Sequence, residues 1–368
     1  MIVFLIHTQK PFTETRLFDK IAPALQTIPG ISTYVLGCAQ GASPPLTGGE
    51  NCFVGKTQKN WRLINMYRCW QKLAEVRPGA VVVASPELIP IGFAYRLIYN
   101  RPLILDVQEN IGLNFLYQAA YKGSLFQSKI AARLLKWFQK TAINLANAAW
   151  LAEEIYGSQL VPIGQKVLLL ENKIPTYPIS AERKETTSTL LFSGVITRES
   201  GIERALKFFD QWSHWMPNWK LTIAGYAPDP EVQRMVVDYT ARNSAIEVLG
   251  ISDWVKHEAI LEALQMADAV LISYVETKAN RGKRPTKWFE AAFFEKPCIV
   301  PESNHWEHLE GTIQVNYENA TEEDVMAIIS KINKPLYTSK SEDYVFDTHA
   351  LSDHFRSVIL KNASDPDR

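Results

Sequence analysis

The sequence predicts an α/β protein with two domains, each built on a parallel β-sheet covered by helices. Three observations lead to this prediction. The chain has 368 residues, short apolar runs alternate with longer helical patterns, and one polar segment containing two prolines interrupts the alternation. A chain of this length exceeds what one hydrophobic core usually supports. Alternating strand and helix patterns are typical of parallel sheets with both faces buried.

The first half of the chain contains four predicted strands and three predicted helices. Residues 2–6 form a short apolar run without a basic leader, which we interpret as a buried strand rather than a signal peptide. The other elements follow from apolar runs and from apolar residues at helical spacing. The predicted strands are 2–6, 33–36, 80–84 and 103–105, and the predicted helices are 13–25, 61–75 and 128–146.

The polar segment 174–188 breaks this rhythm and is the predicted linker. After it the alternation resumes, with predicted strands at 190–192, 221–223, 247–249, 269–272 and 298–300 and a last helical pattern at 350–361. We therefore assign 1–173 to an N-terminal domain, 189–345 to a C-terminal domain and 346–368 to a C-terminal helix.

Composition excludes several classes of protein. Lys and Arg together balance Asp and Glu, 39 against 39, so no general charge favours nucleic-acid binding. The cysteines Cys38, Cys52, Cys69 and Cys298 have neither paired nor metal-like spacing and predict reduced thiols in a cytoplasmic protein. No apolar run is long enough to predict a helix that spans a membrane.

The segment 281–297, with the sequence RGKRPTKWFEAAFFEKP, carries the clearest functional pattern. A cluster of cations precedes Thr286 and Lys287, and Glu290 opens an apolar helical pattern. A helix N-terminus with added positive charge suits a phosphate. One turn into that helix, Glu290 can accept hydrogen bonds from the vicinal hydroxyls of a sugar. The pattern therefore predicts binding of a nucleotide sugar.

The order of motifs in the second half resembles the group 1 (retaining) glycosyltransferases of GT-B architecture, over most of residues 189–331, as a divergent member. The matching motifs are LLFSGVITRESGIERAL (190–206), WKLTIAGYAPD (219–229), IEVLGISD (246–253), ILEALQMADAVLISY (260–274) and TKWFEAAFFEKPCIV (286–300). In the first half, RPLILDVQEN (101–110) and VLLLENKIP (167–175) match more faintly. The resemblance implies two Rossmann-like doubly wound domains facing a central cleft, with the C-terminal helix crossing back to the N-terminal domain.

The resemblance also implies a donor site in the C-terminal domain and an acceptor site in the N-terminal domain. Donor-binding residues are Gly194, Gly225, Gly250, Ile251, Thr286, Lys287 and Glu290, with Arg198, Lys287 and Glu290 as the catalytic set. Residues on the acceptor or sugar side are His7, Lys10, Asp106, Gln108 and Glu109. Plainer interpretations stay open: turn glycines, surface cations, a structural His7, and a Glu290 that interacts only with the helix dipole.

The chain departs from the family pattern at four positions. Val195 and Ser200 stand where the family has cations for the diphosphate, and Gly282 stands where a first glutamate is expected. Arg198, with Lys283, Arg284 and Lys287, could restore the positive charge. Gln108 replaces a histidine and cannot act as a base near neutral pH.

No metal or other cofactor is expected, because the cations would neutralise the departing diphosphate. The residues His305, Glu307 and His308 are spaced like metal ligands, but they lack a zinc-helix pattern and predict a surface loop.

Between residues 110 and 152 the chain has cations and no acids: Lys122, Lys129, Arg133, Lys136 and Lys140. Interleaved apolar residues make this an amphipathic segment, which predicts either peripheral contact with an anionic membrane or an ordinary helix with a solvated basic face.

The sequence as a whole predicts a cytoplasmic, metal-independent, hexosyltransferase-like enzyme. It would transfer a sugar with retention from a UDP- or GDP-linked donor to a glycan or lipid-linked acceptor in bacterial cell-envelope polysaccharide biosynthesis. The alternative is a catalytically inactive GT-B scaffold that binds a partner or a glycan, which the four departures favour. A sugar-nucleotide epimerase of the same architecture is less favoured, because no acid pairs are evident.

Overall fold

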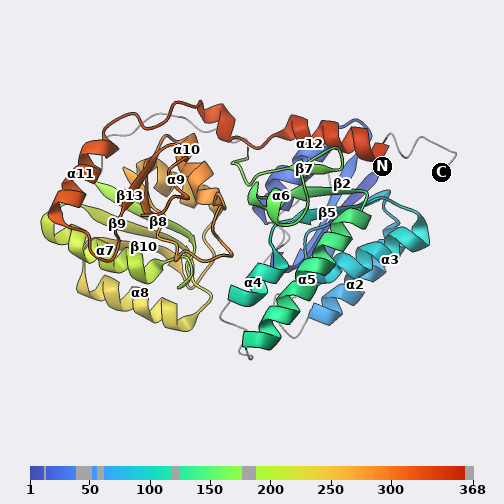
Figure 1. The fold of residues 1–368 in the computed structure, drawn as a ribbon, viewed down its shortest axis with the longest axis horizontal. Coiled ribbons are helices and arrows are strands. Elements are labelled where there is room, and N and C mark those ends of the chain that lie inside the picture. The colour runs from blue at the N-terminus through green and yellow to red at the C-terminus, as the bar shows by residue number, and fades with distance from the viewer. Residues whose placement is uncertain (12–13, 39–51, 56–61, 118–124, 176–187, 361–368) are drawn as a thin grey trace. The chain divides into compact units, whose positions relative to one another are not determined.

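The computed structural model describes the whole chain except residues 12–13, 39–51, 56–61, 118–124, 176–187 and 361–368 (Figure 1). The chain divides into two compact units. The first contains Met1–Pro175, Lys278–Lys283 and Phe346–Arg368, and the second contains Thr176–Thr277 and Arg284–Val345. The predicted C-terminal domain included residues 278–283, whereas these residues pack with the first unit, where Gly282 lies against Ile155. Most of the predicted linker falls outside the described residues.

The first unit is built on a seven-stranded parallel sheet with the strand order β3-β2-β1-β4-β5-β6-β7. The strands are β1 (Ile2–Pro11), β2 (Ser32–Cys38), β3 (Cys52–Gly55), β4 (Ala80–Val83), β5 (Leu103–Val107), β6 (Ala148–Leu151) and β7 (Val167–Leu169). All residues of β4, β5 and β6 are buried, as the continuous apolar runs predict. The direction of strand addition reverses between β1 and β4, and such a switch point is where doubly wound sheets bind ligands.

Helices cover both faces of this sheet. On one face are α2 (Arg62–Val76), η3 (Pro86–Leu88), α3 (Ile89–Tyr99), α4 (Ile111–Tyr117), α5 (Leu125–Leu145) and α6 (Ile155–Gln159); on the other are η1 (Arg16–Ile21), α1 (Ala22–Gln26), α12 (Thr348–Phe355) and η5 (Arg356–Leu360). Because side chains alternate along a strand, Phe4 and Ile6 pack under α2, α3 and α5. Val3 and Leu5 point to the other face and pack under α1 and α12.

The second unit repeats the doubly wound arrangement with a six-stranded parallel sheet in the order β10-β9-β8-β11-β12-β13. Its strands are β8 (Thr189–Val195), β9 (Lys220–Tyr226), β10 (Ile246–Ile251), β11 (Ala269–Leu271), β12 (Cys298–Pro301) and β13 (Thr312–Val315). Its helices are α7 (Ile202–Trp215), α8 (Pro230–Arg242), α9 (His257–Met266), α10 (Thr286–Phe293), α11 (Glu322–Ile332) and η4 (Ser341–Tyr344). The switch point lies between β8 and β11. The predicted α/β class with two doubly wound sheets is confirmed.

Several helices of the second unit begin at polar caps that the sequence places there. The Asp229 side chain accepts a hydrogen bond from the backbone N–H of Glu231 at the start of α8. At α11, Thr321 and Asp324 bond each other's backbone N–H groups in a capping box. These local bonds satisfy N–H groups that the first turn of a helix leaves unpaired, so the capping residues determine where α8 and α11 begin.

Among the described residues no helix is both long and apolar enough to cross a bilayer. The described cysteine side chains, Cys69 and Cys298, are free and buried, whereas the side chains of Cys38 and Cys52 lie outside the described residues.

The packing of α12 predicts that Phe355→Ala destabilises the first unit by about 3–5 kcal/mol, because it leaves a cavity in a fully buried site. Urea unfolding of the purified chain measures this. Met326→Ala, at an exposed position on α11, should change the free energy of unfolding by less than about 0.5 kcal/mol. Equal effects of the two substitutions would contradict the packing described.

Candidate functional site

The carboxyl ends of three neighbouring strands in the second unit are lined by a row of glycines. Gly194 of β8 pairs with Gly225 of β9, and Gly225 pairs with Gly250 of β10. A Cβ atom at Gly225 would lie 1.8 Å from the Gly194 carbonyl oxygen, so no larger residue fits there. At Gly250 the side-chain position is likewise filled, by Val255 at 2.3 Å, whereas a Cβ on Gly194 would meet only Lys287 at 4.0 Å. The glycines at 225 and 250 therefore let the strand ends pack closely, and the backbone at Gly194 is the part of the row that a ligand can approach.

The residue that follows this row, Ile251, has a φ of +78°. A β-branched side chain rarely adopts this left-handed conformation, which costs about 1–3 kcal/mol. Backbone strain of this kind is concentrated at binding sites.

Lys287 lies at the switch point beside this row. It is the second residue of α10, is 9% exposed, and its Cε lies 4.0 Å from the position that a Cβ on Gly194 would occupy. Its Nζ lies 4.9 Å from the ring centre of Phe192 and 5.0 Å from that of Tyr274. In the part of the chain that the structure describes, no carboxylate forms an ion pair with it.

The surroundings of Lys287 change its acidity. Burial lowers the pKa of Lys287 to about 8, although the nearby Glu290 and Cys298 act in the opposite direction. A buried ammonium is costly unless an anion accompanies it. The site is therefore suited to a negatively charged ligand.

Glu290 is held by a histidine that the sequence analysis did not identify. The Glu290 carboxylate is 6% exposed, and its Oε1 lies 2.7 Å from Nε2 of His257, the first residue of α9. Its other oxygen, Oε2, accepts no hydrogen bond from the described residues. One oxygen is fixed and the other can accept a ligand hydroxyl, which fits the predicted contact with a ribose.

The loop between β8 and α7 carries Arg198 at the same end of the sheet. Its guanidinium is half exposed and pairs with Glu203 at 3.4 Å and Glu231 at 3.5 Å. Within the loop, Thr197 and Ser200 hydrogen-bond each other reciprocally, so Ser200 has a structural role where the family has a cation. A contact between Arg198 and a phosphate stays a prediction, as does a contact from Thr286, the first residue of α10.

Lys283, which the sequence groups with the cations Arg284 and Lys287, belongs to the first unit. It packs with the first unit, with its Nζ 5.6 Å from the ring centre of Tyr156. Burial lowers the pKa of Lys283, and the neighbouring carboxylates of Glu153 and Glu109 oppose that effect. The predicted contribution of Lys283 to a phosphate site stays a prediction.

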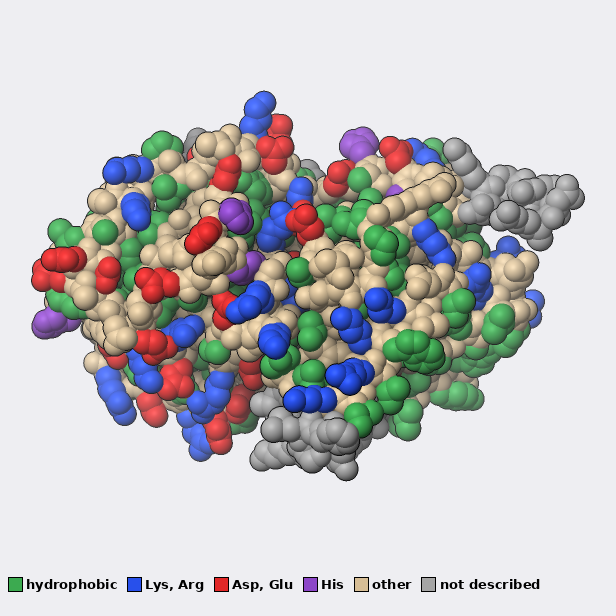
Figure 2. All heavy atoms as spheres, in the orientation of Figure 1, with side chains coloured by type: hydrophobic (Ala, Val, Ile, Leu, Met, Phe, Trp, Pro, Cys, Tyr) green, Lys and Arg blue, Asp and Glu red, His purple; other side chains and the backbone are tan. Residues whose placement is uncertain are grey.

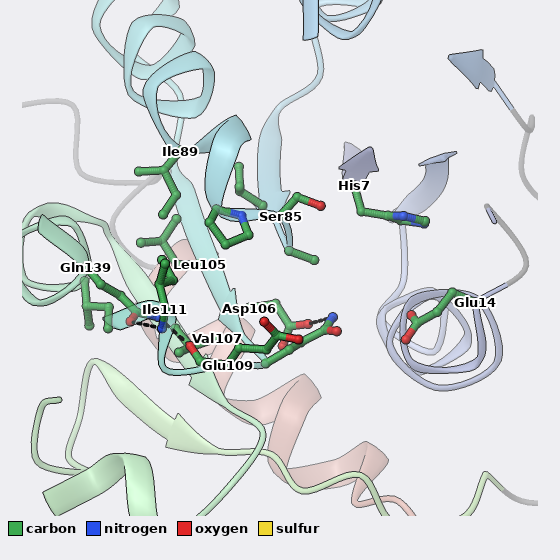
Figure 3. A pocket seen from close by; sticks show the side chains of 15 residues that line it. His7, Glu14, Ser85, Ile89, Leu105, Asp106, Val107, Glu109, Ile111 and Gln139 are labelled. Atoms are coloured by element: carbon green, nitrogen blue, oxygen red, sulfur yellow. Dashed lines mark hydrogen bonds between the residues drawn. The ribbon is translucent and has the colours of Figure 1, made fainter. Parts of the chain in front are cut away.

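The first unit has a pocket of about 130 Å³ at the carboxyl ends of β1, β4 and β5 (Figure 3). Figure 3 shows Ile89 and Ile111 on one side and His7 and Glu14 on the opposite side. The pocket contains four of the predicted acceptor-side residues, His7, Asp106, Gln108 and Glu109, together with Glu14, Ser85 and Gln139, which the sequence analysis missed. The side chain of Lys10 lies outside the described residues.

Asp106 lines this pocket, but its carboxylate is already engaged. Arg16 donates to both of its oxygens, from Nε at 3.0 and 2.9 Å and from the terminal nitrogen at 2.6 Å, and Gln108 donates at 2.8 Å. Burial alone would lower the pKa of Arg16, but the Asp106 carboxylate raises it overall. Through these hydrogen bonds Asp106 orders the wall of the pocket.

No family model matches this sequence, and no curated protein matches it. Solved structures do match its fold over nearly its whole length. Sucrose-phosphate synthase from Thermosynechococcus elongatus has a TM-score of 0.64 at 12% identity, and the match covers 98% of this chain and 96% of the synthase chain. HepE from Anabaena, in complex with UDP and glucose, has a TM-score of 0.66 at 13% identity, and the match covers 98% of this chain and 99% of the HepE chain. The fold is GT-B.

A third GT-B structure, the lipopolysaccharide outer core galactosyltransferase WaaB, matches at a TM-score of 0.52 and 11% identity, covering 99% of this chain and 98% of its own. The predicted GT-B architecture is therefore confirmed. Similarity at this level of identity concerns the fold, so the predicted roles of individual residues stay predictions. Among the described residues, no group of three or more metal-ligating side chains is placed to hold a metal ion.

The uncompensated burial of Lys287 predicts that Lys287→Met stabilises the protein. The pKa of about 8 lies below the ordinary value of 10.5, so burying the charged form costs about 3 kcal/mol, partly offset by the aromatic contacts. The folded state binds fewer protons than the unfolded state between pH 8 and 10.5, so this cost is complete below pH 8 and disappears above that interval.

The variant should therefore unfold with a free energy about 2 kcal/mol larger than the natural protein at pH 7, and the difference should shrink toward pH 10. Urea unfolding at several pH values measures it. A variant that is less stable than the natural protein at pH 7 would refute the account of Lys287.

The ion pair in the first unit predicts the opposite result. Arg16→Met leaves the Asp106 carboxylate buried without its cation and should cost about 3–5 kcal/mol. The double variant Arg16→Met, Asp106→Leu should recover part of this loss, because no charge then stays buried. Urea unfolding tests both variants, and a single-variant loss below about 1 kcal/mol would show that the pair is not needed.

Proposed function

We propose that this protein transfers a sugar, with retention of configuration, from a UDP- or GDP-linked donor to a glycan or lipid-linked acceptor. The observation that carries the proposal is the buried, uncompensated Lys287 beside the glycine row at a switch point. An anion that enters beside Gly194 would offset the part of that charge which Glu290 does not balance, and a diphosphate fits this requirement. HepE, which shares the fold, was solved with UDP-glucose and with UDP and glucose.

In this proposal each donor group has a partner in the second unit. The diphosphate contacts the backbone at Gly194, the ammonium of Lys287 and the first turn of α10 at Thr286, with Arg198 adding charge from its loop. The free oxygen of Glu290 accepts from the ribose hydroxyls, and the nucleoside lies along Gly225, Gly250 and Ile251.

Catalysis then depends on electrostatic stabilisation of the leaving diphosphate, rather than on a protein base. Lys287 and Arg198 offset the negative charge that develops as the bond to the sugar breaks, so the proposal requires no metal. The acceptor hydroxyl passes its proton to the departing phosphate on the same face of the sugar. His7, Gln108 and Glu109 in the first unit orient the acceptor or the transferred sugar.

The setting of this reaction is also part of the proposal. Cell-envelope polysaccharide biosynthesis in a bacterial cytoplasm would supply both a nucleotide sugar and a glycan or lipid-linked acceptor. The inactive scaffold becomes the better interpretation only if no nucleotide binds.

Calorimetric titration with UDP and GDP tests the donor site. Lys287→Met should weaken binding about 100-fold and Glu290→Gln about 10- to 100-fold, because each removes a charge-assisted contact. Affinity in the natural protein should fall above pH 8, as Lys287 loses its proton. This fall above pH 8 should be absent in Lys287→Met.

Matched controls lie at the opposite end of the same sheet, where Lys220 pairs with Glu247 at 2.7 Å. Lys220→Met and Glu247→Gln should leave nucleotide affinity within about twofold, since surface pairs contribute little. Incubation with UDP-glucose and other donors then tests hydrolysis or transfer, and NMR of the product reports its anomeric configuration. Failure of every nucleotide to bind would exclude the transferase and favour the scaffold.

A further inference from the structure

We propose that the outer face of helices α2, α3 and α5 binds the surface of an anionic lipid bilayer. The buried sides of these helices contribute to a single hydrophobic core on one face of the first unit's sheet, so their outer sides form one layer. We call this outer side the basic face. The exposed residues of this face line neither the pocket of the first unit nor the site around Lys287, so the inference does not rest on the proposed function.

Large apolar side chains project from the basic face. The most exposed are Leu97 of α3 at 82%, Leu63 of α2 at 78% and Trp137 of α5 at 66%, and Tyr67, Ile98 and Leu134 are also more than half exposed. Single exposed apolar residues are ordinary, but a concentration on neighbouring helices marks an interaction surface. The face therefore has apolar groups available for burial in a partner.

Positive charge surrounds these apolar groups. The cations include Arg68 of α2, Arg96 of α3 and Lys129, Arg133, Lys136 and Lys140 of α5, whereas the three helix sequences contain one acid, Glu75, which pairs with Lys72 at 2.8 Å. Figure 2 shows blue and green side chains intermixed over this part of the first unit, with almost no red. The chain as a whole has no net charge, so the charge is segregated. Lys122, which the sequence analysis grouped with this set, falls outside the described residues.

A bilayer surface fits this combination better than a soluble partner. Projecting aliphatic side chains and a tryptophan can enter the boundary between head groups and acyl chains, while lysine and arginine contact anionic head groups. The 21 residues of α5 give it a length of about 30 Å, which suits a helix lying along a membrane. Since no described helix can cross a bilayer, the contact is at the surface.

The inner side of α5 connects this face to the pocket of the first unit. Gln139 and Ile143 of α5 line that pocket, whereas Arg133, Trp137 and Lys140 of the same helix are exposed. If the proposed function also holds, docking through this helix would hold the pocket near the membrane surface. A lipid-linked acceptor would then be favoured over a soluble glycan.

The test is cosedimentation of the full chain with vesicles of phosphatidylcholine containing about 30 mol% phosphatidylserine, compared with phosphatidylcholine alone. The natural protein should bind the anionic vesicles, and binding should weaken as salt rises. The triple variant Lys129→Gln, Arg133→Gln, Lys140→Gln should bind about 100-fold more weakly, at about fivefold per cation. Leu134→Ser with Trp137→Ser should also weaken binding, by about tenfold or more.

The matched control is Arg242→Gln, Lys331→Gln, Lys334→Gln, which removes the same charge from exposed positions in the second unit. It should bind anionic vesicles within about twofold of the natural protein. The proposal is overturned by no binding to anionic vesicles, by equal binding to neutral vesicles, or by a basic-face variant that binds like the control. It is also overturned if these variants instead dissolve a dimer in sedimentation velocity while vesicle binding is absent.

Nucleotide titration of the same variants separates this inference from the proposed function. The basic-face variants should keep the UDP or GDP affinity of the natural protein, because none of the substituted residues belongs to the second unit. Vesicle binding without nucleotide binding would leave the inference standing and remove the transferase.

Discussion

A buried ammonium group without an ion-pair partner among the described residues is the constraint on which the second unit depends. Lys287 has the rings of Phe192 and Tyr274 as neighbours, and aromatic faces offset only part of the cost of removing a cation from water. Glycines are in register on the three strands beside it, and the backbone at Gly194 carries no side chain between Lys287 and a ligand. The burial of Lys287 thus costs stability at the switch point, the position where doubly wound sheets bind ligands. Such a loss of stability is common at functional sites.

The two switch points of the molecule treat charge in opposite ways. In the first unit Arg16 and Asp106 are both buried, and hydrogen bonds join the guanidinium to both carboxylate oxygens. In the second unit no carboxylate of the described residues forms an ion pair with Lys287. A compensated pair orders a wall, whereas an uncompensated cation creates affinity for an anion. The same doubly wound arrangement therefore carries two different electrostatic environments at its two switch points.

Charge is also unevenly distributed over the surface. The net charge of the chain is zero. Nevertheless, the charged residues of helices α2, α3 and α5 are almost all basic. Composition averages over the chain, but electrostatic attraction depends on the local density of charge within a Debye length. The helix that presents Trp137 and Lys140 outward also presents Gln139 to the pocket, so one element connects the basic face with the pocket.

The sequence alone determined the alternation of strands and helices, the start of α10 at Thr286 and Lys287, and the glycines at strand ends, because these depend on residues close together in the chain. It missed the strands β3, β6 and β13, whose four residues each carry too little periodicity. Only the tertiary structure decided which side chains meet: His257 with Glu290, Arg16 with Asp106, and Lys283 with the first unit. These partners are far apart in the chain, and their free energy depends on burial, which arises only when the sheets and helices have packed together.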